Sequence, residues 1–447
     1  MKRTKKLYLL CVVFLFIAVS AFIISNMEER KEKIKNSDEI ILNIDTDKVK
    51  GLSWEYDDKK MAFHKEKKWQ YDDDEKFPVN KKKIESMLEQ FQEFGVSFVI
   101  EEVEDFGQYG LDEPECTITI EEEEKTYEIL LGDYSTMDSE RYVSIGDGNV
   151  YLVKKDPLEK FDVEIEDMIQ HDKIPEFEDV KEIHISGSEE LIVVYDEEQE
   201  GSYCEEDVYY AKIDSEMLPL DTGNITSYLD TLTDLNPKNY VTYDASEETL
   251  KQYGLDKPEF TIEIRYEKEE KEKSFTLSVG KEEEEKSYIR INDSKLVYEI
   301  ESDDREELLD AGYDSWRHRE LVTAAMEDIS SIDVVLEEES YTIEVKEKNN
   351  DMVCVYKGEE QEDSHFIDKL QYLEADSFTD EEKSEKEEVN LTLHFKDEKY
   401  PDQKITIYRY DGLKCLVAMG GEPHSLVERT SAVDLIEAIR EIILNEQ

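Results

Sequence analysis

The stretch Tyr109-Gly110-Leu111-Asp112-Glu113-Pro114-Glu115 returns later in the chain as Tyr253-Gly254-Leu255-Asp256-Lys257-Pro258-Glu259. The two copies differ only at the fifth position. The residues on either side of both copies also align, with apolar and polar positions in the same order. A match of this extent predicts that the chain repeats a whole structural module and not merely a short motif.

The composition of this stretch, which we call the Tyr-Gly-Leu-Asp phrase, predicts a turn. Its glycine tolerates a positive φ, its aspartate can bond the backbone two residues on, and its proline ends the turn before a strand. We interpret the phrase as a joint that sets each module's helix against its sheet. The alternative is a ligand-gripping loop displayed twice, with both aspartates exposed. The residues concerned are Tyr109, Gly110, Leu111, Asp112 and Pro114, and then Tyr253, Gly254, Leu255, Asp256 and Pro258.

Length and composition predict a large folded protein with an acidic surface. A chain of 447 residues suggests about three domains. With 26 Tyr and 16 Phe it is too rich in aromatic residues for a disordered chain, although 38% of it is charged. The net charge of −61 predicts a surface that repels nucleic acid and anionic lipid headgroups, so we expect no nucleic-acid partner. We interpret the acidic excess first as solvated faces that keep the protein soluble. The alternative is weak, diffuse attraction of divalent cations or of a basic partner.

The cysteines predict neither a disulfide scaffold nor a metal centre. No C-x-x-C pair occurs, and the seven histidines do not stand near a cysteine at zinc-ligand spacing. A single incidental disulfide among the four cysteines that follow Cys11 stays a possible alternative. The cysteines are Cys11, Cys116, Cys204, Cys354 and Cys415.

The N-terminus predicts a membrane anchor. Four basic residues within positions 2–6 precede an uncharged, mostly apolar run at 7–24, which is long enough to span a bilayer as a helix. The basic flank should stay in the cytoplasm, so the rest of the chain would lie outside a cell membrane crossed once. A cleaved signal ending at Ala18-Val19-Ser20 is the alternative, although the apolar run continues to Ile24. A lipoprotein signal does not fit, because Leu9-Leu10 precede Cys11.

The predicted fold class is α+β: an N-terminal transmembrane helix followed by tandem repeats of antiparallel sheet plus helices. In each of the first two repeats, short strands lead to a capped helix, and the phrase, further strands and a closing helix follow. Asn80 and Asp221 are the expected caps, the first helix reaches Phe94, and the first closing helix runs over 158–169. The predicted parts are an anchor and stalk at 1–35 and modules at 36–175, 176–322 and 323–447.

The third module is predicted as a divergent copy that lacks the phrase. Its strands and helices follow the same order, with Ser364 expected to cap the helix that carries Phe366 and Leu370. A changed terminal unit is typical of repeat proteins, where it acts as a cap.

The chain carries no recognisable catalytic motif, such as a nucleophile elbow, a Walker loop or a zinc-protease helix. We therefore predict no catalytic, cofactor-binding or metal-binding residues. His184 and His394 are expected on strands and His424 in a loop, and Trp54, Trp69 and Trp316 in the core.

Several features carry a resemblance to a known family. They are the basic N-terminus with its predicted anchor, the Trp69-to-Pro78 entry into the helix, the first copy of the phrase, Leu131-Gly132, Arg141-Tyr142-Val143 and Val150-Tyr151-Leu152-Val153. Together they resemble the bacterial family called domain of unknown function 4340, over most of residues 40–310. The resemblance implies a membrane-anchored protein that accompanies ABC-type exporters on the outer side of the membrane. It supplies no catalytic residues.

We thus expect a non-enzymatic, membrane-anchored extracytoplasmic binding or scaffold protein, with an ABC-type transporter as the implied partner. Two other functions stay open at this point. One is a cell-surface module that binds wall polymer or divalent cations through its acidic hairpin tips. The other is a hydrolase whose site is assembled across modules.

Overall fold

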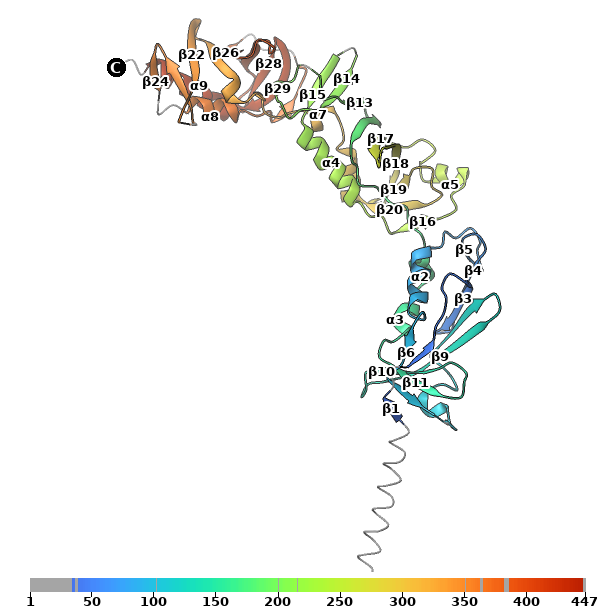
Figure 1. The fold of residues 1–447 in the computed structure, drawn as a ribbon. Coiled ribbons are helices and arrows are strands. Elements are labelled where there is room, and N and C mark those ends of the chain that lie inside the picture. The colour runs from blue at the N-terminus through green and yellow to red at the C-terminus, as the bar shows by residue number, and fades with distance from the viewer. Residues whose placement is uncertain are drawn as a thin grey trace, which may run out of the picture. The chain divides into compact units, whose positions relative to one another are not determined.

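The computed structural model describes residues 34–36, 39–101, 103–199, 201–214, 216–349, 351–361, 365–381 and 386–444 (Figure 1). The predicted anchor at 7–24 and the predicted cap Ser364 lie outside these residues. Among the helices that are described, none combines the length and the apolar character needed to cross a membrane. The chain divides into two compact units, Met1–Asp172 and Lys173–Gln447, which are taken in turn below.

The first unit is built on one nine-stranded antiparallel sheet. Its strand order is β1-β7-β11-β10-β9-β8-β3-β4-β5, so the β3-β4-β5 meander joins the β8-to-β11 meander through β3 and β8. The small pair β2 (Ile40–Leu42) and β6 (Phe94–Gly95) lies apart from it. The strands of the sheet are β1 (Ile34–Asn36), β3 (Val49–Tyr56), β4 (Lys59–Lys65), β5 (Trp69–Tyr71), β7 (Phe98–Ile100), β8 (Cys116–Glu122), β9 (Thr126–Ser135), β10 (Glu140–Ser144) and β11 (Val150–Val153).

Helix α2 (Lys81–Glu89) begins at the predicted cap: the Asn80 side chain accepts a hydrogen bond from the Lys83 N–H at 3.2 Å. The helix ends earlier than predicted. Phe91 lies in the turn that follows, and Phe94 belongs to β6. Both rings are nonetheless buried and stack edge-on at 5.1 Å, which shows that apolar spacing alone did not locate the end of the helix.

The predicted closing helix at 158–169 is two short helices, α3 (Leu158–Phe161) and η2 (Ile165–Met168). The chain leaves the helical conformation at Asp162, and Glu164 and Asp167 form a capping box that starts the second piece. Phe161 of α3 packs edge-on against Trp54, whose ring is buried in the sheet as predicted.

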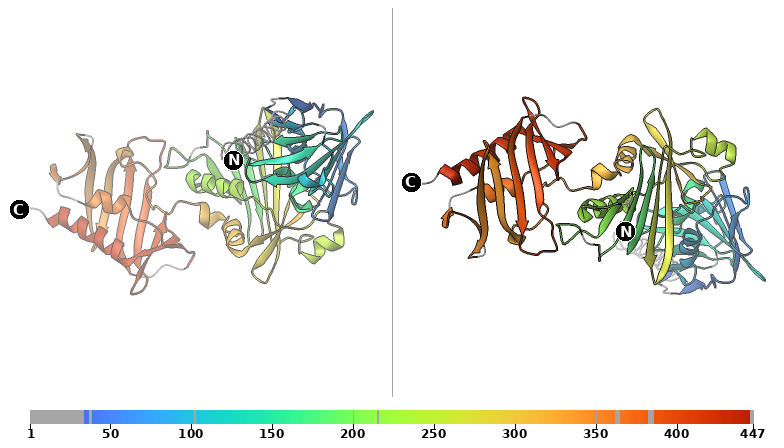
Figure 2. Two further views of the ribbon diagram at one scale, coloured as in Figure 1. Left: turned by 90° about the horizontal axis from the view of Figure 1, so that it is seen from below. Right: turned by 90° about the horizontal axis from the view of Figure 1, so that it is seen from above.

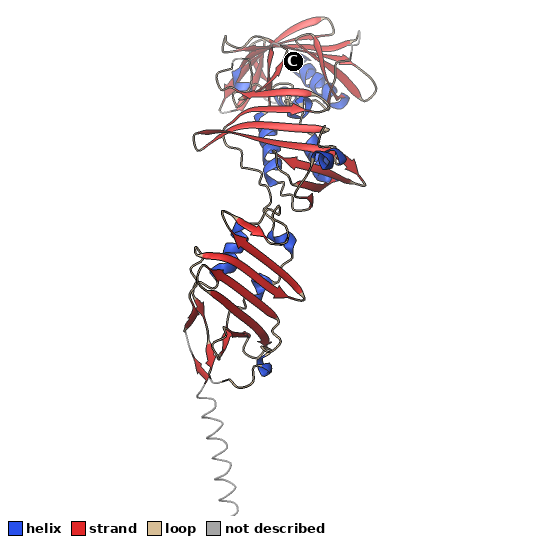
Figure 3. Cartoon of the chain, turned by 90° about the vertical axis from the view of Figure 1, so that its right-hand side faces the viewer, coloured by secondary structure: helices blue, strands red, loops and turns tan. Residues whose placement is uncertain are grey.

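The second unit carries two nine-stranded sheets of identical topology. Their orders are β15-β14-β13-β12-β17-β18-β19-β20-β16 and β24-β23-β22-β21-β26-β27-β28-β29-β25. In both, a four-strand meander pairs through its first strand with a second meander, and one short strand closes the far edge. The third module therefore repeats the fold of the second although it lacks the phrase. Strands dominate both modules in Figure 3.

The second module contains β12 (Val180–Ser186), β13 (Glu190–Tyr195), β14 (Tyr209–Ile213), β15 (Glu216–Leu220), β16 (Tyr240–Thr242), β17 (Phe260–Lys268), β18 (Lys271–Glu283), β19 (Lys286–Ile291) and β20 (Val297–Glu301). Its helices are α4 (Thr222–Asp234), α5 (Glu247–Gln252), α6 (Ser302–Leu309) and α7 (Tyr313–Trp316). Asp221 caps α4 as predicted. The predicted single closing helix is broken between α6 and α7, where Gly312 is fully extended.

The third module contains β21 (Ile329–Leu336), β22 (Glu339–Lys348), β23 (Asp351–Tyr356), β24 (Glu359–Gln361), β25 (Ser377–Phe378), β26 (Glu387–Phe395), β27 (Gln403–Arg409), β28 (Lys414–Met419) and β29 (Glu422–Glu428). Helices α8 (Phe366–Gln371) and α9 (Arg429–Leu444) pack together and share one core with the sheet (Figure 2). His424 lies in β29, so the prediction that it stands in a loop is wrong.

Candidate metal centre

The two copies of the phrase lie against the sheets. Gly110 and Gly254 have φ of +69° and +71°, the left-handed conformation that favours glycine. A Cβ on the sheet residue Gly132 would lie 2.2 Å from the Tyr109 carbonyl oxygen, and a Cβ on Gly280 equally close to that of Tyr253. The turn backbone therefore rests directly on a strand position where only hydrogen fits.

Side chains of the phrase complete this contact. The ring of Tyr109 lies 5.0 Å from that of Tyr142 on β10, and Tyr253 pairs with Tyr288 of β19 at 4.4 Å. The leucines are buried, the prolines are half-buried and Asp112 and Asp256 are exposed. These contacts are with the sheet, so the joint that the phrase forms connects its own turn to the sheet.

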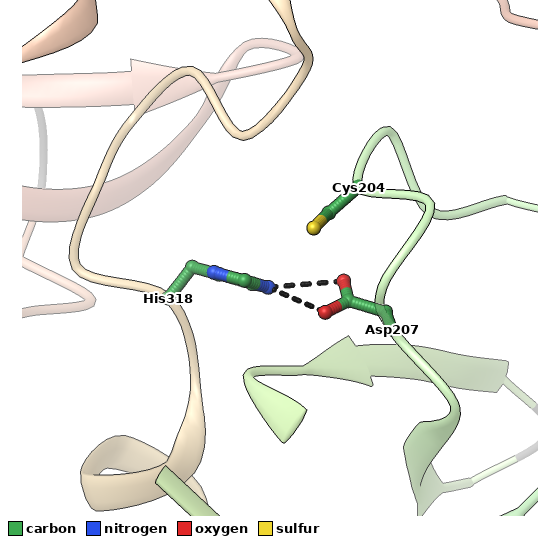
Figure 4. Close-up of side chains that lie close together, drawn as sticks. All are labelled: Cys204, Asp207 and His318. Atoms are coloured by element: carbon green, nitrogen blue, oxygen red, sulfur yellow. Dashed lines mark hydrogen bonds and ion pairs between the residues drawn. The ribbon is translucent and has the colours of Figure 1, made fainter. Parts of the chain in front are cut away.

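Ligand-type side chains gather at a place that no motif in the sequence indicates. Cys204, Asp207 and His318 have their Sγ, carboxylate and imidazole atoms within 4.8 Å of one another. Cys204 and Asp207 belong to the loop between β13 and β14, and His318 follows α7 (Figure 4). Nε2 of His318 lies 2.9 Å from each carboxylate oxygen of Asp207.

The β13–β14 loop holds two of these side chains in place. The Ser202 hydroxyl donates to Oδ2 of Asp207 at 2.6 Å and accepts the backbone N–H of Cys204 at 3.0 Å. The Tyr210 hydroxyl donates to the backbone carbonyl of Asp207 at 3.2 Å. Because only 1% of the Asp207 side chain is exposed, its carboxylate has few ways to reorient.

Two further carboxylates face the opposite nitrogen of His318. Oδ2 of Asp221 lies 3.8 Å from Nδ1 of His318, and Oε2 of Glu320 lies 4.0 Å from it. Asp221 is oriented by its capping role, since its Oδ1 accepts the N–H groups of Gly223 and Asn224 at the start of α4. The imidazole thus lies between carboxylates on both sides.

This setting changes the pKa of both titratable groups that could release a proton. Burial alone would lower the pKa of His318, but the hydrogen bond that its Nε2–H donates to Asp207 and the charges of Asp207, Asp221 and Glu320 outweigh it and raise that pKa. Burial raises the pKa of the Cys204 thiol, against the backbone hydrogen bonds that favour its thiolate. A metal ion binding here would therefore displace protons.

A cavity of about 660 Å³ opens beside the cluster, between the second and third modules. Apolar and amide groups line part of it, including Tyr203, Val322 and Gln371. Within the described part of the chain no lysine or arginine lines this cavity, and His318 is its one basic side chain. Its acidic side chains are Glu205, Glu206, Asp221, Glu320, Glu327, Asp328 and Glu374. Such a lining attracts cations.

The sequence could not place these residues together, because His318 and Asp207 stand 111 positions apart. The aligned caps supplied a partial signal: Asp221 was identified as the start of α4, but nothing in the spacing tied it to His318. The other predicted strand histidines lie where expected, His184 on β12 and His394 on β26.

A family model described as domain of unknown function (DUF4340) matches the chain twice, over residues 69–240 and 212–392. The second match reaches into β26 of the third module. Neither a curated protein nor a solved structure matches the chain.

Proposed function

The chain belongs to the family of domain of unknown function 4340, and we propose that it is a non-enzymatic, extracytoplasmic binding protein whose ligand site is the acidic cavity between its second and third modules. In this proposal residues 7–24 anchor it in a bacterial cell membrane, and its partner is a subunit of an ABC-type transporter. The acidic cavity is the observation that carries the proposal.

The chemistry of the cavity supports a cationic ligand. Seven carboxylate side chains line it with one histidine, and a volume of about 660 Å³ accommodates several side chains of a partner. Arginine and lysine side chains form charge-assisted hydrogen bonds with carboxylates, so a basic segment of a partner protein fits this lining. The basic flank before residue 7 and the apolar run support an outward-facing body.

The test is recovery of a partner from membranes. The full chain, tagged at its C-terminus, would be purified from detergent-solubilised membranes of its own organism beside a variant carrying Glu327→Gln, Asp328→Asn and Glu374→Gln. A matched control, Glu269→Gln, Glu270→Gln and Glu284→Gln, removes three charges from hairpin turns instead. We expect a transporter subunit to accompany the wild type and the control, and to be lost from the cavity variant.

Two results would overturn the proposal. One is recovery of the full chain in the soluble fraction without a membrane-associated partner. The other is equal recovery of the same partner with the cavity variant and the control.

A second candidate ligand, a divalent cation, is favoured by the cluster of ligand-type side chains on the cavity wall.

A further inference from the structure

We infer that Cys204, Asp207 and His318 form a binding site for a divalent transition-metal ion of the zinc class. This site lies at the wall of the cavity that we propose above as the binding site for a partner. The metal ion would be a second ligand of that cavity. The inference needs only these three side chains, so it can hold where the partner proposal fails, and its test measures metal and not partner recovery.

The donor set selects the class of metal. A thiolate, an imidazole nitrogen and one carboxylate are typical zinc ligands, and soft sulfur ligation favours zinc over calcium or magnesium. Calcium would require six to eight oxygen ligands, which a site containing Cys204 does not supply. The three side chains leave a fourth position on the cavity side for water or a partner's ligand.

The distances also fit. Zinc bonds of about 2.0–2.3 Å in a tetrahedral site place two ligand atoms roughly 3.5 Å apart. The Nε2–carboxylate distances of 2.9 Å would lengthen by a few tenths of an ångström, and Sγ, within 4.8 Å of both groups, would move inward. Side-chain rotations of Cys204 and His318 suffice for changes of this size, while the buried Asp207 stays in place.

The surrounding groups match the outer shell of a metal site. Ligating histidines usually point their other ring nitrogen at a carboxylate or carbonyl, which fixes the tautomer. Here Nδ1 of His318 faces Asp221 and Glu320, while Ser202 donates to Asp207. The same residues form a plain His–Asp ion pair when Nε2 carries a proton, and the metal ion would replace that proton.

Metal binding would link two separate segments of the chain. Cys204 and Asp207 come from the β13–β14 loop, whereas His318 lies at the start of the segment that enters the third module. An ion that binds the folded arrangement and not the unfolded chain stabilises the fold by mass action. The junction between the second and third modules should therefore unfold at a higher temperature with zinc than without it.

The experiment is a titration of the full chain after chelator treatment, with ZnCl₂ followed by calorimetry and CoCl₂ followed by absorption. We expect one tightly held zinc ion per chain, and a thiolate-to-cobalt charge-transfer band. Cys204→Ser should abolish that band and weaken zinc binding at least tenfold, while keeping the Asp207–His318 ion pair and hence the fold. Asp207→Asn should weaken binding to a similar extent.

The matched control is His394→Ala. His394 also contacts two carboxylates, Asp333 at 3.0 Å and Asp402 at 2.9 Å, but among the described residues no cysteine joins it in a ligand cluster. Zinc affinity should be unchanged in this variant. The inference is overturned if cobalt gives no thiolate band, if Cys204→Ser binds zinc as the wild type does, or if zinc binds only weakly at many sites that calcium fills equally well.

Discussion

At the scale of single residues, two histidines of the third module show how local surroundings set a proton affinity. The hydrogen bond with Asp333 raises the pKa of His394 against its partial burial, and Asp402 adds to the effect. Burial, with a smaller contribution from the charge of the Arg317 guanidinium, lowers the pKa of His424 to about 4. The first histidine therefore favours its charged form in the folded state, and the second its neutral form.

The low pKa of His424 predicts a loss of stability in mild acid. Its unfolded pKa is near 6.5, so between about pH 6.5 and pH 4 the unfolded chain binds a proton that the folded chain does not. The contribution of neutral His424 to the free energy of unfolding is therefore complete above about pH 6.5 and is lost as the pH falls toward 4. His424→Gln should flatten this part of the stability profile, measured as urea midpoints from pH 4 to 8.

His394→Gln is the control of opposite sign. Because the folded pKa of His394 is raised, its contribution is complete below about pH 6.5 and is lost as the pH rises through the folded value. The slope of the stability profile should therefore differ from that of the wild type below about pH 6.5 in His424→Gln, and above about pH 6.5 in His394→Gln. Parallel profiles for His424→Gln and the wild type below pH 6.5 would contradict the assignment.

The close approach of the phrase to its sheet predicts two intolerant glycines. Gly132→Ala and Gly280→Ala would each place a Cβ 2.2 Å from a backbone carbonyl oxygen, so the turn must move. We expect each substitution to lower the free energy of unfolding by roughly 2–3 kcal/mol, as overpacking does. Gly412→Ala, where a Cβ lies more than 4 Å from every described residue other than its chain neighbours, is the control. If the unfolding temperature shifts equally in all three variants, the close contact between the phrase and its sheet does not contribute to stability as we expect.

At the scale of elements, several hairpins turn on pairs of acidic residues in the left-handed conformation. Asp57-Asp58, Glu269-Glu270, Glu284-Glu285 and Glu337-Glu338 all have positive φ at both positions. Two-residue hairpin turns of this type favour Asn-Gly, because a residue with a Cβ is strained there. These turns therefore combine backbone strain with repulsion between neighbouring carboxylates.

Relieving the backbone strain in one such turn should stabilise its hairpin. Glu269→Asn with Glu270→Gly, between β17 and β18, should raise the free energy of unfolding by about 1 kcal/mol. The paired variant Glu269→Gln with Glu270→Gln removes the same charges and keeps the strain. Urea unfolding should separate them: if the two variants gain equally, charge and not backbone conformation is the cause.

Elements were predictable from sequence where a local signal marks them. Asn80 and Asp221 cap their helices as expected, and most strands follow the alternation of apolar residues. The errors lie where tertiary contacts decide. Phe94 fits a helical spacing but joins β6, and β29 was missed because Gly420-Gly421 and Pro423 suggested a loop around His424. Its pairing with β28 forms only in the folded sheet.

At the scale of the whole molecule, the strand topology is retained in the third module, where the motif that revealed the repeat is absent. The third module has the strand order of the second without any Tyr-Gly-Leu-Asp phrase. The candidate metal centre was beyond reach of the sequence for a related reason. Its ligands come from a loop of one module and from the segment leading to the next, and no short-range pattern records that they meet.

The second and third modules form one compact unit because specific side chains cross between them. Tyr203 of the second module stacks on Phe395 at 5.0 Å and donates its hydroxyl to the Pro401 carbonyl at 3.1 Å. In the connecting segment, the Arg317 guanidinium lies 3.6 Å from the centre of the Phe378 ring and donates to the His424 carbonyl at 3.2 Å. From these contacts we expect the two sheets to unfold together.

Removing the Tyr203 contact should therefore uncouple the two modules. Tyr203→Ala loses an aromatic stack and a hydrogen bond, together worth roughly 2–3 kcal/mol. Calorimetry should show the transition of Lys173–Gln447 split into two, and limited proteolysis should cut the segment 317–325 faster. Tyr134→Ala, at a 44% exposed tyrosine in the first unit, should leave both readouts unchanged. A single unsplit transition in Tyr203→Ala would mean that the linker contacts, including those of Arg317, suffice to couple the modules without the aromatic stack.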